Sequence, residues 1–533
     1  MPEYRAPGVF VEEISFRQKS IEGVGTSATA LVGPTCTGPL RGRPEVITSF
    51  SEFVRIYGGC ADLDYAGAVV TNYTALAARA FFDNGGTQLF VSRIVNGVNE
   101  SDSRGDLSSA CRASKTSAGA TVTFRSRFPG AMGNYTLEIR WRDSLRRTFD
   151  LDVRLGNGTS IGDVIWSHTN LTTARDQINS LDKALPVFPQ KREDQVIQPV
   201  SCELGGGDVP SMLQSLFDPG PLNSPQPRYL ITLSGGSDGT QPTAVDYAGE
   251  IDDFLGSTGL AAFESSEDIA IVMAPAAAAD EAAHTAVLLE IQKHCRKMRY
   301  RIGIADSRKG MTPEEVQTFR TVFDDSRMAL YHPWVVVTDP TGRQTNIAVP
   351  PSGFIAGIYA RNDVERGVHK APANEVVRGA LRFEQDINKF QQDVLNPVGI
   401  NCLRSFPGRG NRVWGARTLS SDPEWKYVNV RRYFMYLERS IETSTRWAVF
   451  EPNGDTLWNN IRGSIEDFLF NEWHNGQLLG ATAKEAYFTR CDRSTMTQND
   501  LDNGLMICVV GVATIKPAEF IIFRVSQKTA VAG

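Results

Sequence analysis

The sequence predicts a multidomain protein of mixed α+β and α/β class, whose middle α/β domain holds a mostly parallel sheet. Three observations predict this fold. Strand-like and helical segments alternate between residues 229 and 339, which is typical of a parallel sheet covered by helices. Residues 97–227 are instead β-rich, and residues 375–533 carry two amphipathic helices followed by two apolar runs. A chain of 533 residues has room for about two to four such domains.

The composition is that of an ordinary globular protein, with 41% hydrophobic and 22% charged residues. The formal net charge of −6 argues against a dedicated nucleic-acid binder, which is normally basic. No stretch approaches the ~18 uninterrupted apolar residues of a membrane span, and the start, MPEYRAPGVF, lacks the apolar core of a signal peptide. We therefore expect assembly in the cytoplasm, without nucleic acid and without direct membrane insertion.

The residues that would carry catalysis or bind a cofactor are not arranged in any known motif. The six histidines show neither HxxxH nor HExxH, and no GxSxG segment is present. The Gly-rich segments 204–208 and 233–239 fit neither GxGxxG nor GxxxxGK[ST], so we interpret them as turns. The eight cysteines, none in CxxC spacing, are expected to be reduced thiols. We expect no catalytic, cofactor-binding or metal-binding residue, and no enzyme.

The first segment, residues 1–23, is expected to be an extended arm. Prolines disfavour a helix there, and the apolar residues alternate in a short strand-like pattern made by Pro7, Val9, Phe10, Val11 and Ile14. A strand this short needs a distant partner. It either pairs with the C-terminal domain of its own chain or adds to the sheet of a neighbouring subunit.

The middle domain is expected to comprise residues 24–96 and 228–374, with the β-rich domain, residues 97–227, inserted into it. The first part should hold strands at 28–33 and 88–94, a helix from Ser49 to Tyr57 and a helix at 66–83. Strands are predicted at 229–233, 268–273, 301–305 and 328–337, and helices at 246–255, 280–298 and 313–325. The insertion should contain antiparallel strands at 120–128, 135–142 and 147–155. Small residues around Gly357 predict close packing where the middle domain joins the C-terminal one.

The C-terminal domain, residues 375–533, is expected to be α+β. Apolar residues recur at helical spacing over 427–445 and 455–478. The runs 505–512 and 520–525 are rich in Val, Ile and Phe and predict two strands. The second helix has an acidic, amide-rich face that includes Asn459, Glu466, Asp467 and Asn471.

Six segments of this domain resemble the C-terminal domain of contractile tail sheath proteins, which occur in phage tails, R-type bacteriocins and extracellular contractile injection systems. They are Asn401–Arg404, Trp414–Arg417, Thr418–Asp422, Phe450–Asn453, Thr497–Asn503 and Lys516–Phe520. Most contain rarely used residues such as Trp, Cys and Asn in a fixed order, so a chance match is improbable. The start PGVFVEEI, the following segment IEGVGTSATALVGPT and the segment 349–379 are also similar to the family.

The resemblance implies a structural subunit that polymerises around an inner tube and contracts to drive that tube through a target envelope. It implies that the arms cross to neighbouring subunits, that the 455–478 helix faces the tube, and that the insertion lies on the outer surface. The C-terminal arm is formed by Phe520, Ile521, Ile522, Phe523 and Val525. Expected partners are other sheath subunits, the inner tube protein, and baseplate and tail-terminator or cap proteins.

Two other functions within the same family stay open from the residues alone. The chain could be a sheath-like baseplate or tail-cap component, or a relative of the type VI secretion sheath. The type VI sheath is split over two chains, whereas this chain carries both arms and the middle domain. We therefore expect a phage tail or phage-tail-like injection particle.

Overall fold

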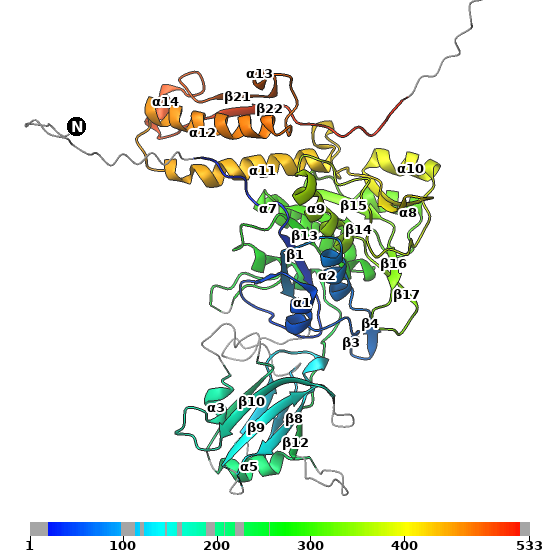
Figure 1. Cartoon of the computed structure of the whole chain (residues 1–533), viewed down its shortest axis with the longest axis vertical. Helices are drawn as coiled ribbons and strands as arrows, with labels where there is room; N and C mark the ends of the chain where they lie inside the picture. Colours follow the sequence, from blue (N-terminus) through cyan, green and yellow to red (C-terminus); the bar gives the residue numbers. More distant parts are fainter. Residues whose placement is uncertain are drawn as a thin grey trace, which may run out of the picture. The chain divides into compact units, whose positions relative to one another are not determined.

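The computed structural model describes residues 20–96, 112–117, 122–143, 147–156, 162–187, 198–206, 208–218, 229–254 and 256–522. They form two compact units, one made of the described residues between 25 and 432 and one made of residues 433–522 with residues 20–24 (Figure 1). Several predicted arm residues lie outside the described residues: Pro7, Val9, Phe10, Val11, Ile14, Phe523 and Val525. None of the described helices combines the length and the apolar character needed to cross a membrane.

The larger unit is built on an eight-stranded sheet of order β2-β5-β1-β13-β14-β15-β19-β20. The strands are β2 (Val46–Ile47), β5 (Leu89–Arg93), β1 (Thr29–Gly33), β13 (Ile271–Met273), β14 (Ile302–Asp306), β15 (Met328–His332), β19 (Ile400–Phe406) and β20 (Gly410–Val413). All neighbouring pairs from β5 to β19 are parallel, and only β2 and β20 run antiparallel to their neighbours. The predicted, mostly parallel sheet is confirmed.

Helices cover both faces of this sheet, because each strand sends alternate side chains to opposite faces. In β1, Leu31 joins one apolar core and Val32 the other. The first core also contains side chains of α2 (Tyr73–Asp83) and α9 (Ser352–Arg366), whereas the second contains side chains of α7 (His284–Met298) and α8 (Pro313–Arg320). Helices α2 and α9 pack closely: a Cβ added at Gly357 would lie 2.4 Å from the Phe81 carbonyl oxygen. This packing lies within the larger unit, whereas the sequence predicted it at the junction with the C-terminal domain.

The predicted helix over 66–83 is wrong in its first half. Residues Leu63–Tyr65 (β3) and Ala68–Val70 (β4) pair as an antiparallel hairpin. Its turn residues, Ala66 and Gly67, have φ values of 55° and 95°. Two consecutive positive φ values belong to the turn type that joins two-residue hairpins. Helix α2 begins only at Tyr73, where the Asn72 side chain accepts a hydrogen bond from the backbone N–H of Ala75.

The predicted strand 229–233 exists but belongs to another sheet. It appears as β12 (Tyr229–Thr232) and pairs antiparallel with β8 (Thr136–Trp141). Strand β12 is therefore the last strand of the insertion's own sheet, and the chain returns to the eight-stranded sheet only after it. In the structure the inserted region begins after Asn96 and ends before Thr240, where a β-bridge joins these two residues. The predicted end at residue 227 is therefore too early.

The inserted region consists of two small antiparallel sheets around a common core. One has the order β10-β9-β8-β12 and the other β11-β7-β6. The strands are β6 (Ser114–Thr116), β7 (Val122–Ser126), β9 (Thr148–Arg154), β10 (Val164–Thr172) and β11 (Val200–Leu204), and helices α3 (Leu181–Ala184) and α5 (Val209–Leu216) accompany them. The three predicted strands correspond to β7, β8 and β9, although β7 lies in a different sheet from the other two.

Three further predicted elements differ in extent. The helix over 246–255 is only α6 (Ala244–Ala248), and the helix over 313–325 ends at Arg320. The strand over 328–337 is two strands, β15 and β16 (Val335–Thr338), which belong to different sheets on either side of Pro333. Strand β16 pairs with β17 (Asn346–Val349) and β18 (Arg382–Phe383). Proline lacks a backbone N–H, so it interrupts a ladder where it stands.

The structure divides the chain near residue 432, whereas the sequence placed the boundary at 375. The reason is β19, which pairs with β15 in the large sheet and so draws residues 375–432 into the larger unit. Two further helices of this unit are α1 (Phe50–Tyr57) and α10 (Lys389–Leu395). Each begins after a residue whose side chain accepts a hydrogen bond from a backbone N–H of the first turn, Ser49 for α1 and Asn388 for α10.

The smaller unit contains the predicted pair of long helices. Helix α11 (Val428–Thr445) enters this unit at Tyr433, and α12 (Asp455–His474) follows it. Then come α13 (Ala483–Ala486), β21 (Tyr487–Arg490), α14 (Gln498–Asp502) and β22 (Val509–Val512). The strand predicted over 505–512 is shorter, and Phe520–Ile522, the described part of the run 520–525, forms no strand within the chain.

Candidate functional site

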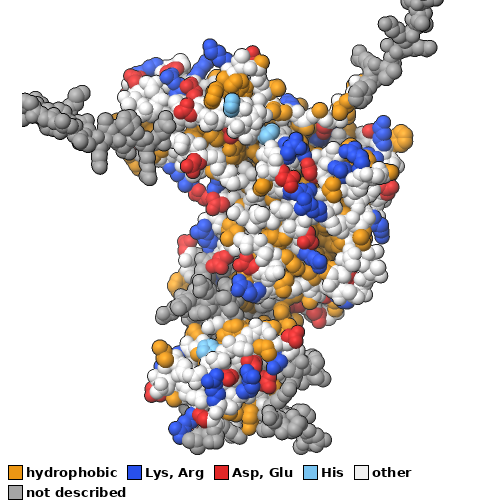
Figure 2. Space-filling model, viewed as in Figure 1, with side chains coloured by type: hydrophobic (Ala, Val, Ile, Leu, Met, Phe, Trp, Pro, Cys, Tyr) orange, Lys and Arg blue, Asp and Glu red, His pale blue; other side chains and the backbone are white. Residues whose placement is uncertain are grey.

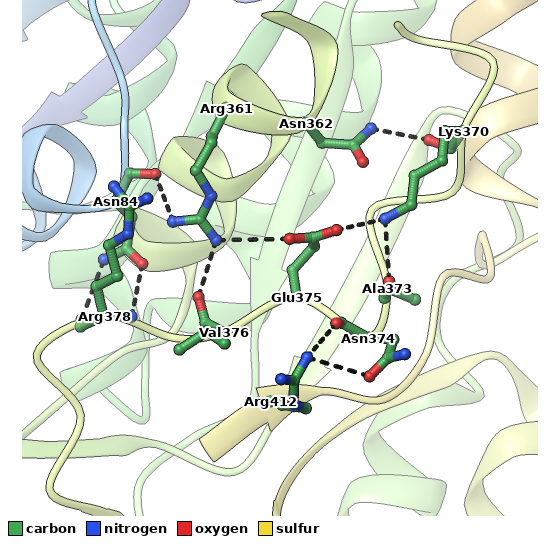
Figure 3. Close-up of polar contacts among 10 residues, drawn as sticks. All are labelled: Asn84, Arg361, Asn362, Lys370, Ala373, Asn374, Glu375, Val376, Arg378 and Arg412. Atoms are coloured by element: carbon green, nitrogen blue, oxygen red, sulfur yellow. Dashed lines mark hydrogen bonds and ion pairs between the residues drawn. The ribbon is translucent and has the colours of Figure 1, made fainter. Parts of the chain in front are cut away.

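A dense polar network fixes the segment 370–378, which the sequence singled out as similar to the sheath family (Figure 3). Arg361 of α9 donates to the carbonyl oxygens of Asn84 and Val376 at 3.1 and 2.9 Å. Glu375 forms ion pairs with Arg361, at 3.8 Å, and with Lys370. Burial lowers the pKa of the Arg361 guanidinium below its ordinary value.

The rest of this network joins the segment to strand β20. Arg412 donates to the Asn374 carbonyl oxygen at 2.6 Å, and Asn374 adopts a φ of 59°. Asn84, which ends helix α2, accepts from the Arg378 backbone N–H at 2.9 Å. The charged groups are thus paired with each other or with backbone carbonyls. The arrangement holds a loop in place and leaves no group poised for chemistry.

A buried serine–histidine contact is the feature of the larger unit that most resembles a catalytic pair. Ser307 Oγ lies 3.0 Å from His332 Nδ1. Both side chains are no more than 1% exposed, and burial lowers the pKa of His332 to about 4. No substrate can reach a pair enclosed in this way, so its role is structural. Among the described residues, no group of His, Cys, Asp or Glu is arranged to hold a metal ion.

The end of the N-terminal arm is attached to helix α11 in the smaller unit. The backbone N–H of Glu22 donates to Ser444 Oγ at 3.2 Å, and that of Val24 donates to Ser440 Oγ at 3.1 Å. Gly23 lies against Tyr436, whose hydroxyl would stand 2.3 Å from a Cβ added at that glycine. These contacts fix the described end of the arm, residues 22–24, on the surface of α11.

A buried carboxylate joins α11 and α12. Glu472 of α12 accepts hydrogen bonds from the hydroxyls of Tyr433 and Tyr436 of α11, at 2.8 and 3.1 Å. Burial raises the pKa of Glu472 above its ordinary value, and the two tyrosine hydrogen bonds oppose that shift. Sequence reasoning did not single out this residue. A sequence signal for it exists: Glu472 lies seven residues after Ile465, which places a carboxylate on the apolar stripe of the helix and so indicates a buried acid.

The four predicted tube-facing residues do not form one uniform face. Asn459, Asp467 and Asn471 are exposed on α12. Glu466 is half-buried and pairs with Arg462 at 4.0 Å. Glu466 and Asp467 both contribute, after burial, to a raised pKa of Tyr487 in β21, so both carboxylates lie near the hairpin. The sequence missed Phe470, which stands between Asp467 and Asn471 with 46% of its surface exposed.

The hairpin β21–β22 is a two-stranded sheet. On its outer face Phe488 and Val509 are 49% and 43% exposed. Beyond it, the side chains of Phe520, Ile521 and Ile522 are 73–78% exposed. Isolated two-stranded sheets are marginal in water, and exposed apolar residues next to open strand edges mark places where another strand can add. Elsewhere on the surface, basic and acidic side chains are interspersed over the face that Figure 2 presents.

Two models of one protein family match consecutive parts of the chain. The phage tail sheath protein central domain matches residues 241–419, and the phage tail sheath C-terminal domain matches residues 420–528, together more than half of the chain. The chain belongs to the phage tail sheath family. The boundary between the two matches lies close to the one that the structure places near residue 432. This is a family of structural proteins, not enzymes.

Relatives within the family align with part of their length. A prophage major tail sheath protein of Pseudomonas aeruginosa is 26% identical over 48% of this chain and 64% of the relative. The tail sheath protein of Escherichia phage P2 is 26% identical over 37% of this chain and 50% of the relative. The chain therefore spans less than two thirds of each of these two sheath proteins.

Solved structures share the fold over almost the whole chain. The sheath of the anti-feeding prophage in its contracted state covers 99% of this chain and 100% of its own, with a TM-score of 0.57 and 23% identity. The sheath of the extracellular contractile injection system PVC, also contracted, covers 99% of both chains, with a TM-score of 0.57 and 21% identity. A sheath tail protein from Listeria innocua covers 93% of this chain and 96% of its own, with a TM-score of 0.57 and 13% identity.

Proposed function

We propose that the protein is the subunit of a contractile sheath that polymerises around an inner tube and shortens to push that tube through a target envelope. The single observation that carries this proposal is the sheath family membership of residues 241–528. The sheath assemblies in which similar chains were solved are consistent with it. The particle would be a phage tail or a phage-tail-like injection system, with baseplate and cap proteins at its ends.

The polymer would be held together by terminal segments that each subunit lends to its neighbours. The exposed Phe520, Ile521 and Ile522 support this, because a run of apolar residues gains from adding to a sheet that needs further strands. The hairpin β21–β22 is the acceptor that fits, since it is two-stranded and exposes apolar side chains. A contact of this head-to-tail kind does not close on itself, so it propagates into a long assembly.

The exposed face of α12 would lie toward the inner tube. Asn459, Asp467 and Asn471 offer amide and carboxylate groups there, and Phe470 offers an apolar contact. Glu466 lies at the edge of this face beside Arg462. Shortening would follow when new interfaces between other parts of neighbouring subunits favour the contracted lattice, so that the extended sheath persists only behind a kinetic barrier.

Removal of the N-terminal arm tests the proposal. A variant lacking residues 1–20 should stay folded, because α11 and α12 keep their own core, yet it should form no cylinders in negative-stain electron microscopy. A variant in which residues 7–14 are replaced by Gly and Ser at equal length separates the side chains from the length of the arm, and it should fail in the same way. Long cylinders from either variant would show that the arm is only an internal strand, and compact monomers from the full-length chain would contradict the polymer itself.

A further inference from the structure

Two cysteines stand at facing positions of the β21–β22 hairpin. Arg490 pairs with Val509 in antiparallel register, so the next facing pair is Cys491 with Cys508. The hydrogen bond from the Ala513 N–H to the Ala486 carbonyl, at 2.8 Å, marks pair 486/513 as hydrogen-bonded.

Hydrogen-bonded and non-hydrogen-bonded pairs alternate along an antiparallel ladder, so the register makes 491/508 a non-hydrogen-bonded pair. Facing Cα atoms in such a pair are about 4.5 Å apart. That separation lies within the range of about 4.4–6.8 Å that a disulfide spans.

The two side chains point to the same face of the hairpin, because facing residues of paired strands share a face. Both are free thiols, Cys491 buried and Cys508 half-buried, and their sulfur atoms are hydrogen-bonded to each other. Burial raises the pKa of Cys508 to about 12 and raises that of Cys491 as well. Arg462 and Glu466 of α12, together with Asp492, are the charged groups around them.

We propose that Cys491 and Cys508 form a reversible cross-strand disulfide, a covalent modification site at the open end of the hairpin. The oxidant is a low-molecular-weight disulfide. Cys508 is the attacking residue because it is the more exposed of the two. Its thiol first loses a proton to solvent, and the small fraction of thiolate that a pKa of about 12 allows attacks one sulfur of the oxidant. The S–S bond of the oxidant breaks, and one small thiolate leaves. The thiolate of Cys491 then attacks the Cys508 sulfur and expels the second small thiolate. The two cysteines lose two electrons, and their two protons pass to the two released thiols.

The new bond closes a loop that contains residues 492–507, including α14. It holds the ends of β21 and β22 together where the ladder otherwise stops at Arg490 and Val509. If the hairpin accepts the arms of neighbouring subunits, a consequence that rests on the proposed function, oxidised subunits keep that acceptor sheet from opening. Formation of the bond itself does not depend on assembly.

The experiment uses the full-length chain, reduced and then incubated with glutathione disulfide at mildly alkaline pH, because burial raises the pKa of both thiols. Remaining thiols are alkylated before digestion with trypsin, which cuts after Arg490 and Arg493 and cuts poorly at Lys516 because Pro517 follows it. Mass spectrometry should find the tripeptide 491–493 joined to the peptide 494–524. The Cys491→Ser variant should accumulate glutathione on Cys508, and the Cys508→Ser variant should leave Cys491 unmodified.

Cys402 is the internal control, since it is fully buried in β19 and should stay unmodified in all three proteins. The proposal is overturned if Cys508 of the parent chain retains glutathione without the joined peptide. It is equally overturned if neither cysteine reacts at oxidant concentrations that link the two in the unfolded chain. The joined peptide is measured on the parent chain, so the test remains decisive even if a variant fails to fold. Loss of polymerisation would not alter the result, because the bond forms within one subunit.

Discussion

Asn401 shows, at the scale of single residues, why two of the segments similar to sheath proteins occur together. Its side chain donates to the carbonyl oxygens of Leu330 and Arg417, at 3.1 and 2.8 Å, and accepts from the Arg417 N–H at 2.7 Å. The amide thus joins β19 to β15 and to the segment after Trp414. The sequence indicated that Asn401 matters, but it could not name these partners, because all three bonds are made with backbone groups of residues distant in the chain.

Asp306 leads to a prediction about pH. It is buried at the end of β14 and accepts the Ser352 N–H at 2.6 Å, at the start of α9. Burial raises its pKa to about 7 from an ordinary value of 3.8. Between these two values the folded chain holds a proton that the unfolded chain has released, so its stability falls as the pH rises. The Asp306→Asn variant keeps an oxygen for Ser352 and removes this dependence.

We expect Asp306→Asn to be more stable than the parent at pH 8, on the order of a few kcal/mol, and to lose that advantage toward pH 4. Denaturant unfolding at both pH values measures it. Asp339→Asn is the control of opposite sign, because hydrogen bonds with Thr341 lower the pKa of Asp339. A lowered pKa stabilises the folded parent at every pH above the ordinary pKa of the carboxyl group. Asp339→Asn should therefore be less stable than the parent at pH 8. Parallel pH profiles for the parent and Asp306→Asn would refute the account.

At the scale of elements, the sequence predicted what local patterns decide. The Thr312 capping box and Pro313 placed the start of α8, and the structure has both bonds of that box. Helix α12 follows its apolar stripe from Asp455. The failures are elements defined by distant partners or by backbone conformation: β12 pairs with β8, and the Ala66–Gly67 turn replaces the start of a helix. Neither the partner of a strand nor a positive φ at alanine leaves a local pattern.

The proposed tube-facing surface of α12 gives a prediction at this scale. Asp467→Lys reverses one exposed charge that no described ion pair holds, so the fold should be kept while tube occupancy falls at low salt. The loss should shrink as salt rises, because exposed charges are screened within ~10 Å at 0.1 M ionic strength. Co-sedimentation of sheath with tube measures it.

Glu466→Lys is the matched comparison, because Glu466 lies beside Arg462 in an ion pair, whereas no ion pair of the described residues holds Asp467. Reversing that charge should lower the stability of the smaller unit as well as tube binding. Equal tube occupancy for Asp467→Lys and the parent at low salt would remove the charge argument for this face.

At the scale of the whole molecule, the sequence predicted an insertion but not where it ends. The structure places the exit at Thr240, whose N–H donates to the Asn96 carbonyl at 3.0 Å. The two ends of the inserted region are therefore adjacent. Contacts that tie it to the rest of the larger unit pass through Asp238, which accepts from the backbone N–H groups of Asp64 and Ala131 at 2.9 and 2.8 Å.

This geometry defines the variant that tests whether the insertion is needed for assembly. We propose that residues 97–239 decorate the outside of the sheath and can be replaced by a short Gly/Ser linker between Asn96 and Thr240. Cutting at residue 228 instead would leave β12 without β8, and its buried Ile231 would face solvent. The variant cut at 239 should fold and form cylinders of smaller outer diameter, because the large sheet and the smaller unit are intact.

Arg93 is where this excision carries a cost. It is buried and donates to the carbonyl oxygens of Thr35 and Gly38, and also to that of Pro129 at 2.7 Å inside the insertion. Loss of Pro129 leaves one guanidinium nitrogen without that acceptor, so the melting temperature should fall. Electron microscopy and thermal unfolding of the two excision variants separate the effects. A folded 97–239 deletion that forms no cylinder would mean that the insertion belongs to the frame of the polymer.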